Sequence, residues 1–186
     1  MTNEAQTRSK FDSKRLFIWG IVIALLLVLG FGLRETNQTQ PTPGNPAPEL
    51  ELSYYEGYEF QGQAQGVLSD LQGEIVVLNF WASWCAPCRQ EAATLEAISR
   101  EYQDRGVTFL GVAWSDTETK ALEYLLEYDI TYPNAPDLGL DAQELYRFKQ
   151  VPETYFIDQS GVIQYFHQGP LTADQLRAFL DQMVGG

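Results

Sequence analysis

The residues most able to do chemistry are the only two cysteines, Cys85 and Cys88, which lie three positions apart. At the start of a helix, thiols at this spacing can form a disulfide, which needs Cβ atoms within about 3.5–4.5 Å. A four-ligand Cys/His zinc site is excluded because His167 is the only histidine in the chain. The pair therefore predicts a redox-active disulfide, and the alternatives are two buried core thiols or an inert structural disulfide.

The two cysteines are expected to play different roles. Cys85 should lie at the helix N-terminus, where free N–H groups and the helix dipole stabilise a thiolate and lower its pKa. Cys88 should lie one turn further in, more shielded, and resolve the mixed disulfide that Cys85 forms. Pro87 suits the first turn, where its missing N–H is not needed. Trp81 and Trp84 are expected to pack around the pair and limit solvent.

The sequence around this pair alternates between strand and helix. Residues 75–81 are a continuous apolar run typical of a strand buried on both faces, and helical spacing follows over 87–102. This order predicts an α/β fold in which parallel strands are joined by right-handed crossovers, with the chemistry at the carboxyl end of the first strand. The other expected elements are one or two edge strands within 49–72, a strand over 107–114, helices over 117–128, 140–148 and 173–183, and a hairpin of strands over 154–158 and 162–167 that adds an antiparallel edge. Asp116 is expected to cap the helix over 117–128.

Residues 16–33 form a run of 18 residues without a charge. As a helix this run would span ~27 Å, close to the hydrocarbon core of a bilayer at about 30 Å. Lys10, Lys14 and Arg15 precede it and only Arg34 follows, so the positive-inside rule places the N-terminus in the cytoplasm. The segment predicts a single-pass anchor with the C-terminal domain outside.

A cleaved signal peptide is the competing interpretation of this segment. It is disfavoured because the apolar run is long and Gly30–Leu33 is a poor cleavage site. Four prolines among polar residues then predict an extended, semi-rigid spacer. The expected organisation is a cytoplasmic tail (1–15), a transmembrane anchor (16–33), a proline-rich linker (34–48) and a folded domain (49–186).

Composition narrows the possible partners. The chain holds 25 acidic and 12 basic residues, a net charge of -13, and 45% of its residues are hydrophobic. A chain this acidic repels phosphate backbones, so nucleic-acid binding is not expected. The hydrophobic fraction is sufficient for a core, and the acidic surface favours solubility or the approach of a basic partner.

Two motifs, Val77–Glu91 and Val151–Asp158, carry a resemblance to a known family. Across roughly residues 46–184 the chain resembles the thioredoxin superfamily, specifically the membrane-anchored TlpA/ResA/CcmG (DsbE)-type thiol-disulfide oxidoreductases. The resemblance implies a thioredoxin-like fold, a mixed central sheet flanked by helices. Pro-Glu-Thr with the strand after it, and the stretch from His167 to Leu171, are most similar to the cytochrome c biogenesis members.

The resemblance also implies roles for single residues around the pair. Pro152 matches the family's cis-proline, which lies opposite the cysteines and presents substrate backbone. Glu91 matches the active-site acid, which takes the proton from Cys88 and, as a like charge, opposes thiolate formation. A solvated helix glutamate is the alternative for Glu91. Asn79 stands where cytoplasmic thioredoxins carry a buried acid, a departure that fits this branch.

A substrate-binding groove is expected from Trp84, Pro87, Val151, Pro152 and Glu153. For Glu153, a plain surface glutamate is an equal alternative. His167 is expected to be a packed strand residue rather than a catalytic one. Trp114 is expected to be a core aromatic, with a part in specificity as the alternative.

The predicted function is reduction of oxidised cysteines in an extracytoplasmic client, with no cofactor. The resemblance implies the C-x-x-C-H pair of apocytochrome c as client and recharging by a membrane thiol carrier of the CcdA/DsbD type. The alternatives are a general envelope reductase, an oxidase, and a non-catalytic tethered binding module. A peroxidase is disfavoured because the chain lacks the Pro-x-x-x-Thr-x-x-Cys arrangement.

Overall fold

The computed structural model describes residues 13–35, 40–137, 139 and 141–185. The chain divides into two compact units, one ending at Thr39 and the other beginning at Gln40. The tail predicted over 1–15 lies outside the described residues as far as position 12, as do residues 36–39 of the predicted linker.

The first unit contains one helix, α1 (Ser13–Glu35). It includes the whole uncharged run over 16–33, so the helix expected there is confirmed. Every side chain from 17 to 30 is exposed, and Phe17 and Val28 each expose 71% of their surface. Among the residues whose side chains are described, no helix is long and apolar enough to cross a membrane.

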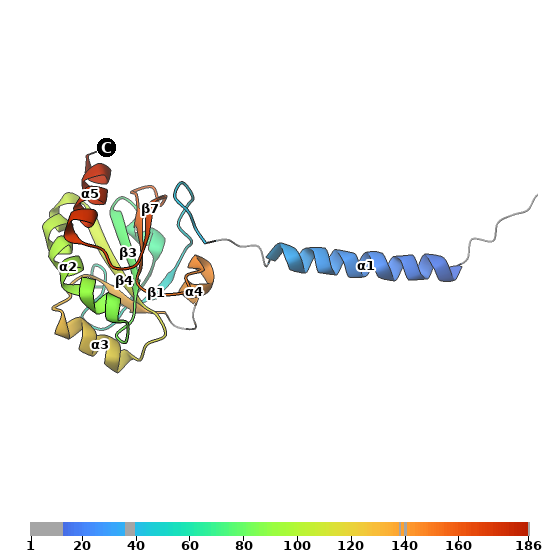
Figure 1. Ribbon diagram of the computed structural model, residues 1–186, viewed down its shortest axis with the longest axis horizontal. Coiled ribbons are helices and arrows are strands. Elements are labelled where there is room, and N and C mark those ends of the chain that lie inside the picture. The colour runs from blue at the N-terminus through green and yellow to red at the C-terminus, as the bar shows by residue number, and fades with distance from the viewer. Residues whose placement is uncertain (1–12, 36–39, 138, 140, 186) are drawn as a thin grey trace, which may run out of the picture. The chain divides into compact units, whose positions relative to one another are not determined.

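The second unit is built on a five-stranded mixed sheet with the order β5-β4-β3-β6-β7 (Figure 1). The strands β3, β4 and β5 are parallel, whereas β6 runs antiparallel to β3 and β7 antiparallel to β6. The strand bounds are β3 Ile75–Trp81, β4 Val107–Ala113, β5 Asn134–Pro136, β6 Glu153–Ile157 and β7 Ile163–Gln168.

Four helices cover this sheet, and a small second sheet pairs β1 with β2 antiparallel. The 3-10 turns η1 and η2 also occur, and α2 and α5 lie side by side on one face (Figure 1). The bounds are α2 Ala86–Tyr102, α3 Glu118–Glu127, α4 Asp141–Tyr146, α5 Ala173–Val184, β1 Glu51–Ser53, β2 Gln65–Val67, η1 Leu68–Leu71 and η2 Gln103–Arg105.

The central strand β3 separates two hydrophobic cores. Ile75 and Val77 belong to the core that also holds the two cysteines, whereas Val76 and Leu78 belong to the core on the other face. Alternate side chains of a strand point to opposite faces, so both faces of β3 are buried. This explains why the run over 75–81 is apolar throughout, as the sequence predicted.

The expected elements are present, with two differences in how the sheet is completed. The predicted hairpin joins the sheet through β6, which pairs directly with β3, so of the two hairpin strands β7 lies at an edge of the sheet and β6 does not. The strand β5 was not predicted, because the three residues Asn-Ala-Pro are too short for a periodic pattern.

The end of the segment predicted as a spacer is attached to the second unit. Gly44 donates its N–H to the carbonyl of Ile163 at 2.8 Å, and the N–H of Ile163 donates to Asn45 at 3.0 Å. Nearby, the Tyr146 hydroxyl donates to the carbonyl of Pro48 at 2.8 Å. The first two contacts satisfy the backbone N–H and carbonyl of Ile163 at the start of β7. Because β7 is an edge strand, these groups would otherwise lack a partner within the sheet.

Candidate active site

The cysteine pair lies where β3 gives way to α2. Cys85 is the N-cap residue of α2, and the N–H of Cys88 points at its sulfur with 3.1 Å between N and Sγ. The two are joined as a disulfide with 5.3 Å between Cα atoms. Cys88 is fully buried, and Cys85 keeps 4% of its surface exposed. The predicted helix N-terminus, with the second thiol more shielded, is confirmed.

The turn before β6 lies against the first cysteine. The carbonyl oxygen of Val151 is 3.4 Å from the sulfur of Cys85. The Val151–Pro152 peptide bond is cis, as the resemblance implied. Because β6 pairs with β3, the sheet itself brings this turn and the cysteine pair together from distant parts of the sequence.

Glu91 lies one turn after Cys88 on the same face of α2 and is 2% exposed. Its carboxylate accepts the side-chain amide of Asn79 at 3.0 Å and the backbone N–H of Leu171 at 2.8 Å. Burial raises the pKa of this carboxyl to about 7, although both hydrogen bonds oppose the rise. A solvated helix glutamate is therefore the wrong description of this residue.

An acid with this pKa can exchange a proton near neutral pH. Asn79 is itself buried on β3, and its amide also donates to the hydroxyl of Thr154 at 2.9 Å. The position that carries an acid in cytoplasmic thioredoxins thus holds the amide that orients Glu91.

Glu153, the residue after the cis-proline, is fully buried. Its carboxylate accepts the side-chain amides of Gln40 at 2.7 Å and Gln168 at 3.0 Å, and burial raises its pKa above the ordinary value. A plain surface glutamate is excluded, and the carboxylate is held by two amides rather than presented to a groove.

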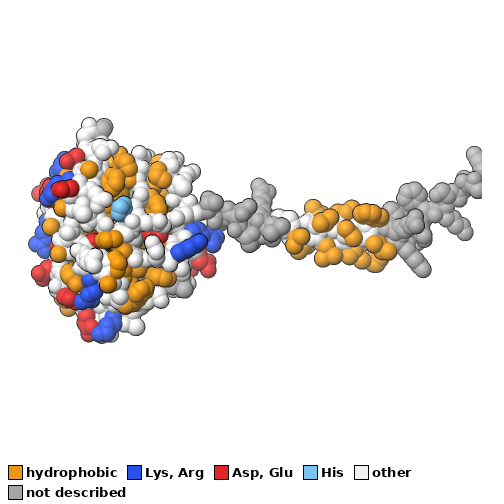
Figure 2. Space-filling model, in the orientation of Figure 1, with side chains coloured by type: hydrophobic (Ala, Val, Ile, Leu, Met, Phe, Trp, Pro, Cys, Tyr) orange, Lys and Arg blue, Asp and Glu red, His pale blue; other side chains and the backbone are white. Residues whose placement is uncertain are grey.

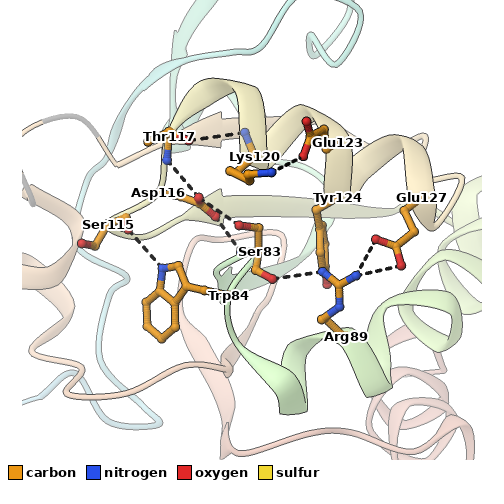
Figure 3. Close-up of a pocket in the computed structure, with 10 residues that line it drawn as sticks. All are labelled: Ser83, Trp84, Arg89, Ser115, Asp116, Thr117, Lys120, Glu123, Tyr124 and Glu127. Carbon is orange, nitrogen blue, oxygen red and sulfur yellow. Dashed lines mark hydrogen bonds and ion pairs between the residues drawn. The ribbon is translucent and has the colours of Figure 1, made fainter.

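Ser83 is held through each of its polar groups (Figure 3). Its N–H and hydroxyl donate to the carboxylate of Asp116 at 2.6 and 3.0 Å, and its carbonyl accepts from Arg89 at 3.1 Å. The next residue, Trp84, donates its indole N–H to the carbonyl of Ser115 at 3.1 Å. We call these contacts the Ser83 frame; they fix the two residues that precede Cys85.

No pattern in the sequence predicts this frame. Asp116, which the sequence indicated as a helix cap, does not cap α3: its N-cap is Thr117, whose hydroxyl accepts from the N–H of Lys120. Asp116 instead bridges to Ser83, 33 positions earlier. The only local sign of the frame in the sequence is the pair Ser83 and Trp84 directly before Cys85.

The two tryptophans of the motif behave differently. Trp81 is buried and stacks on Tyr124 with 4.3 Å between ring centroids, and the Tyr124 hydroxyl donates to the carbonyl of Cys88 at 3.0 Å. Trp84 is 58% exposed. Trp81 thus lies in the core that also holds the two cysteines, whereas Trp84 lies at the surface with its indole N–H bonded to the carbonyl of Ser115.

A pocket of about 490 Å³ opens beside the Ser83 frame. In its lining, Arg89 of α2 pairs with Glu127 of α3, and Lys120 pairs with Glu123 within α3 (Figure 3). Its lining residues are Ser83, Trp84, Arg89, Ser115, Asp116, Thr117, Lys120, Glu123, Tyr124 and Glu127.

The remaining candidates lie around this centre. His167 is half-buried on β7 opposite Thr154, as expected of a packed strand residue. Trp114 is half-buried between Trp84 and Phe148, with ring centroids 5.6 Å from each. Pro87 lies in the first turn of α2. Among the described residues, no group of histidine, cysteine, aspartate and glutamate side chains could hold a metal ion.

The disulfide follows the carboxyl end of the central strand β3, at the N-terminus of α2, and a cis-proline lies opposite it. This arrangement defines the thioredoxin-like thiol-disulfide oxidoreductases. The chain belongs to the AhpC/TSA family, whose model matches residues 43–166.

Known relatives agree with this class. The chain is 31% identical over 181 residues to the thiol-disulfide oxidoreductase ResA of Oceanobacillus iheyensis, covering 97% of this chain and 93% of the relative. It is 35% identical over 188 residues to the thiol:disulfide interchange protein DsbE of Allochromatium vinosum, covering 94% and 97%. A solved Chlorobium tepidum structure described as DsbE matches with a TM-score of 0.68 and 27% identity, over 78% of this chain and 98% of that one. The chain is thus a thiol-disulfide oxidoreductase of the ResA/DsbE type.

Proposed function

We propose that this oxidoreductase works as a reductase of client proteins. The observation that carries the proposal is the buried carboxyl of Glu91, one turn from Cys88. A carboxylate beside the pair opposes thiolate formation, so it disfavours the reduced form. Strong oxidants of this fold have a stabilised reduced form, so a site that disfavours that form favours donation of electrons.

The proposed reaction passes two electrons to the client. The Cys85 thiolate attacks a client disulfide, a mixed disulfide forms, and one client sulfur leaves as a thiolate. Cys88 then gives its proton to Glu91 and attacks the sulfur of Cys85. The second client sulfur leaves, the Cys85–Cys88 disulfide forms, and the client ends as a dithiol.

The carbonyl of Val151 lies 3.4 Å from the sulfur of Cys85, so a client chain bonded to Cys85 would lie against this turn. We propose that Trp84, Pro87, Val151 and Pro152 contact it there. Glu153 would contribute indirectly, because its carboxylate is enclosed by Gln40 and Gln168.

The experiment that tests this function traps the client. The Cys88→Ser variant, with Cys85 reduced, should hold a disulfide-containing peptide as a stable mixed disulfide, because the resolving thiol is gone. The Cys85→Ser variant should form none. Equal trapping by both variants, or by neither, would contradict the proposed order of attack.

We propose further that residues 16–33 tether the enzyme to the cytoplasmic membrane with the second unit outside. The uncharged run and the basic residues before it support this placement. Fractionation of cells and protease digestion of right-side-out vesicles test it. Recovery of the full chain from the soluble fraction would contradict the tether.

The client we favour is apocytochrome c, with recharging by a thiol carrier of the CcdA/DsbD type, and support comes from the Val151–Asp158 motif. Comparing reduction of a C-x-x-C-H peptide with that of an unrelated disulfide peptide separates this client from a general envelope reductase. A tethered binding module would retain its function after Cys85→Ser, whereas the reductase would lose it.

A further inference from the structure

We propose that the pocket beside Trp84 is a client subsite that receives a basic side chain next to the client's reactive cysteine. The proposal rests on the proposed function, because it supplies a specificity to the same disulfide exchange. The pocket is lined by Ser83 and Trp84, the two residues before Cys85, so it adjoins the nucleophile along the chain. An extended client rises about 3.3 Å per residue, so a side chain one or two positions from its cysteine can reach such a neighbour.

The near wall of the pocket is held in place before any client arrives. The hydrogen bonds of the Ser83 frame fix both residues, although Trp84 exposes 58% of its surface. An exposed aromatic ring that is held rigidly loses little conformational freedom when a partner covers it, and such rings are enriched at contact surfaces. The wall is thus suited to an extended polypeptide.

The charged residues of the lining determine which side chain the pocket favours. Three carboxylates, from Asp116, Glu123 and Glu127, face two cations, from Arg89 and Lys120, among the lining residues. Asp116 is committed to Ser83, but Glu123 and Glu127 lie one turn apart on α3, and their ion pairs leave them 60% and 50% exposed. Exposed pairs of this kind rearrange readily.

With three carboxylates and two cations, the lining carries one excess negative charge. A basic side chain in the pocket would neutralise this charge, whereas an acidic one would double it. The net charge of -13 on the whole chain acts in the same direction, because it attracts basic segments over longer distances. A lysine or arginine beside the client's cysteine therefore fits this pocket better than an acidic or neutral residue.

Two disulfide peptides, identical except for a lysine or a glutamate next to one cysteine, test the subsite. The ratio of their kcat/KM values with the reduced enzyme is an internal measure, unaffected by the amount of active protein. We expect the lysine peptide to be preferred about fivefold at low salt and the preference to shrink as salt is added. In Glu123→Lys the ratio should fall to about one or below. In Glu123→Gln it should lie between that value and the ratio of the unmodified enzyme.

Glu51→Lys is the matched control, since it makes the same charge change at an exposed position of β1 outside the pocket. It should keep most of the preference. Equal kcat/KM values for the two peptides with the unmodified enzyme, or equal ratios in Glu123→Lys and Glu51→Lys, would overturn the subsite. Reduction of hydroxyethyl disulfide by the unmodified enzyme tests the proposed function separately. If that reaction proceeds without a peptide preference, only the subsite fails.

Discussion

The two sides of the disulfide differ in kind. On the Cys88 side the neighbours are buried: Cys88 itself is fully covered and Glu91 is 2% exposed. On the Cys85 side, Trp84 is 58% exposed and the polar residues of the Ser83 frame surround an open pocket (Figure 3). The comparison indicates a division of work, in which the buried side controls protons and the redox balance while the open side positions the client.

Figure 2 shows how charge is distributed over one face of the second unit. The view shows charged side chains of both signs spread over the second unit, with apolar side chains gathered between them. Glu91, in contrast, is buried, and its carboxylate accepts hydrogen bonds from the Asn79 amide and the Leu171 backbone N–H, neither of which is charged.

The largest effect is expected on the buried side, from Glu91→Gln. Loss of the proton acceptor should slow resolution of the mixed disulfide about 10²-fold, as is typical for removal of a general base. It should also abolish the rise in rate with an apparent pKa of about 7. Stopped-flow measurement of client release between pH 5 and 9 checks this. An unchanged pH profile in the variant would remove Glu91 from the mechanism.

Glu91 also makes stability depend on pH in a defined direction. Its pKa is raised from 4.5 to about 7 in the folded protein, so its contribution to stability is fully present below pH 4.5 and is lost as the pH rises through about 7. The difference in unfolding free energy between the unmodified protein and Glu91→Gln should shift by about 3 kcal/mol across this window. Denaturant titrations of both proteins at pH 4 and pH 8 measure it, and a constant difference would contradict the raised pKa.

On the open side, Asp116→Ala should act through the Ser83 frame. Without the carboxylate, the N–H and hydroxyl of Ser83 lose their acceptor, so the segment that carries Trp84 is held less firmly. We expect kcat/KM for peptide disulfides to fall about tenfold, mainly through KM, because positioning of the client is lost. Asp116→Asn keeps an acceptor oxygen and should recover much of the loss. If KM rises equally in both variants, the charge of Asp116 matters rather than its geometry.

The effect furthest from the chemistry is expected at Gln40, the first residue of the second unit, where a change should alter stability rather than rate. Gln40→Ala removes one donor from the buried carboxylate of Glu153 and should lower the unfolding free energy by about 1–3 kcal/mol. Gln63→Ala, at an exposed position, is the control and should change it by less than about 0.5 kcal/mol. Equal losses in the two variants would show that the Gln40 contact contributes nothing.

The local part of the site could be predicted from the sequence, and its long-range contacts could not. The strand over 75–81, the helix after it and the spacing of Cys85, Cys88 and Glu91 are local patterns, so the arrangement of β3 and α2 follows from them. The contacts of Ser83 and Glu153 join residues 33 and 113 positions away, and their partners carry no local signal. Such pairs are determined by how the strands are ordered in the sheet, which periodicity does not specify.

The reduction potential of the Cys85–Cys88 pair, measured by equilibration with a thiol buffer at pH 7, tests the central claim most directly. If the buried side disfavours the reduced form, the potential should lie near that of thioredoxin, at about -270 mV or lower. A value near about -120 mV would show that the reduced form is stabilised, as in a strong oxidant, and would contradict the assignment of this enzyme as a reductase.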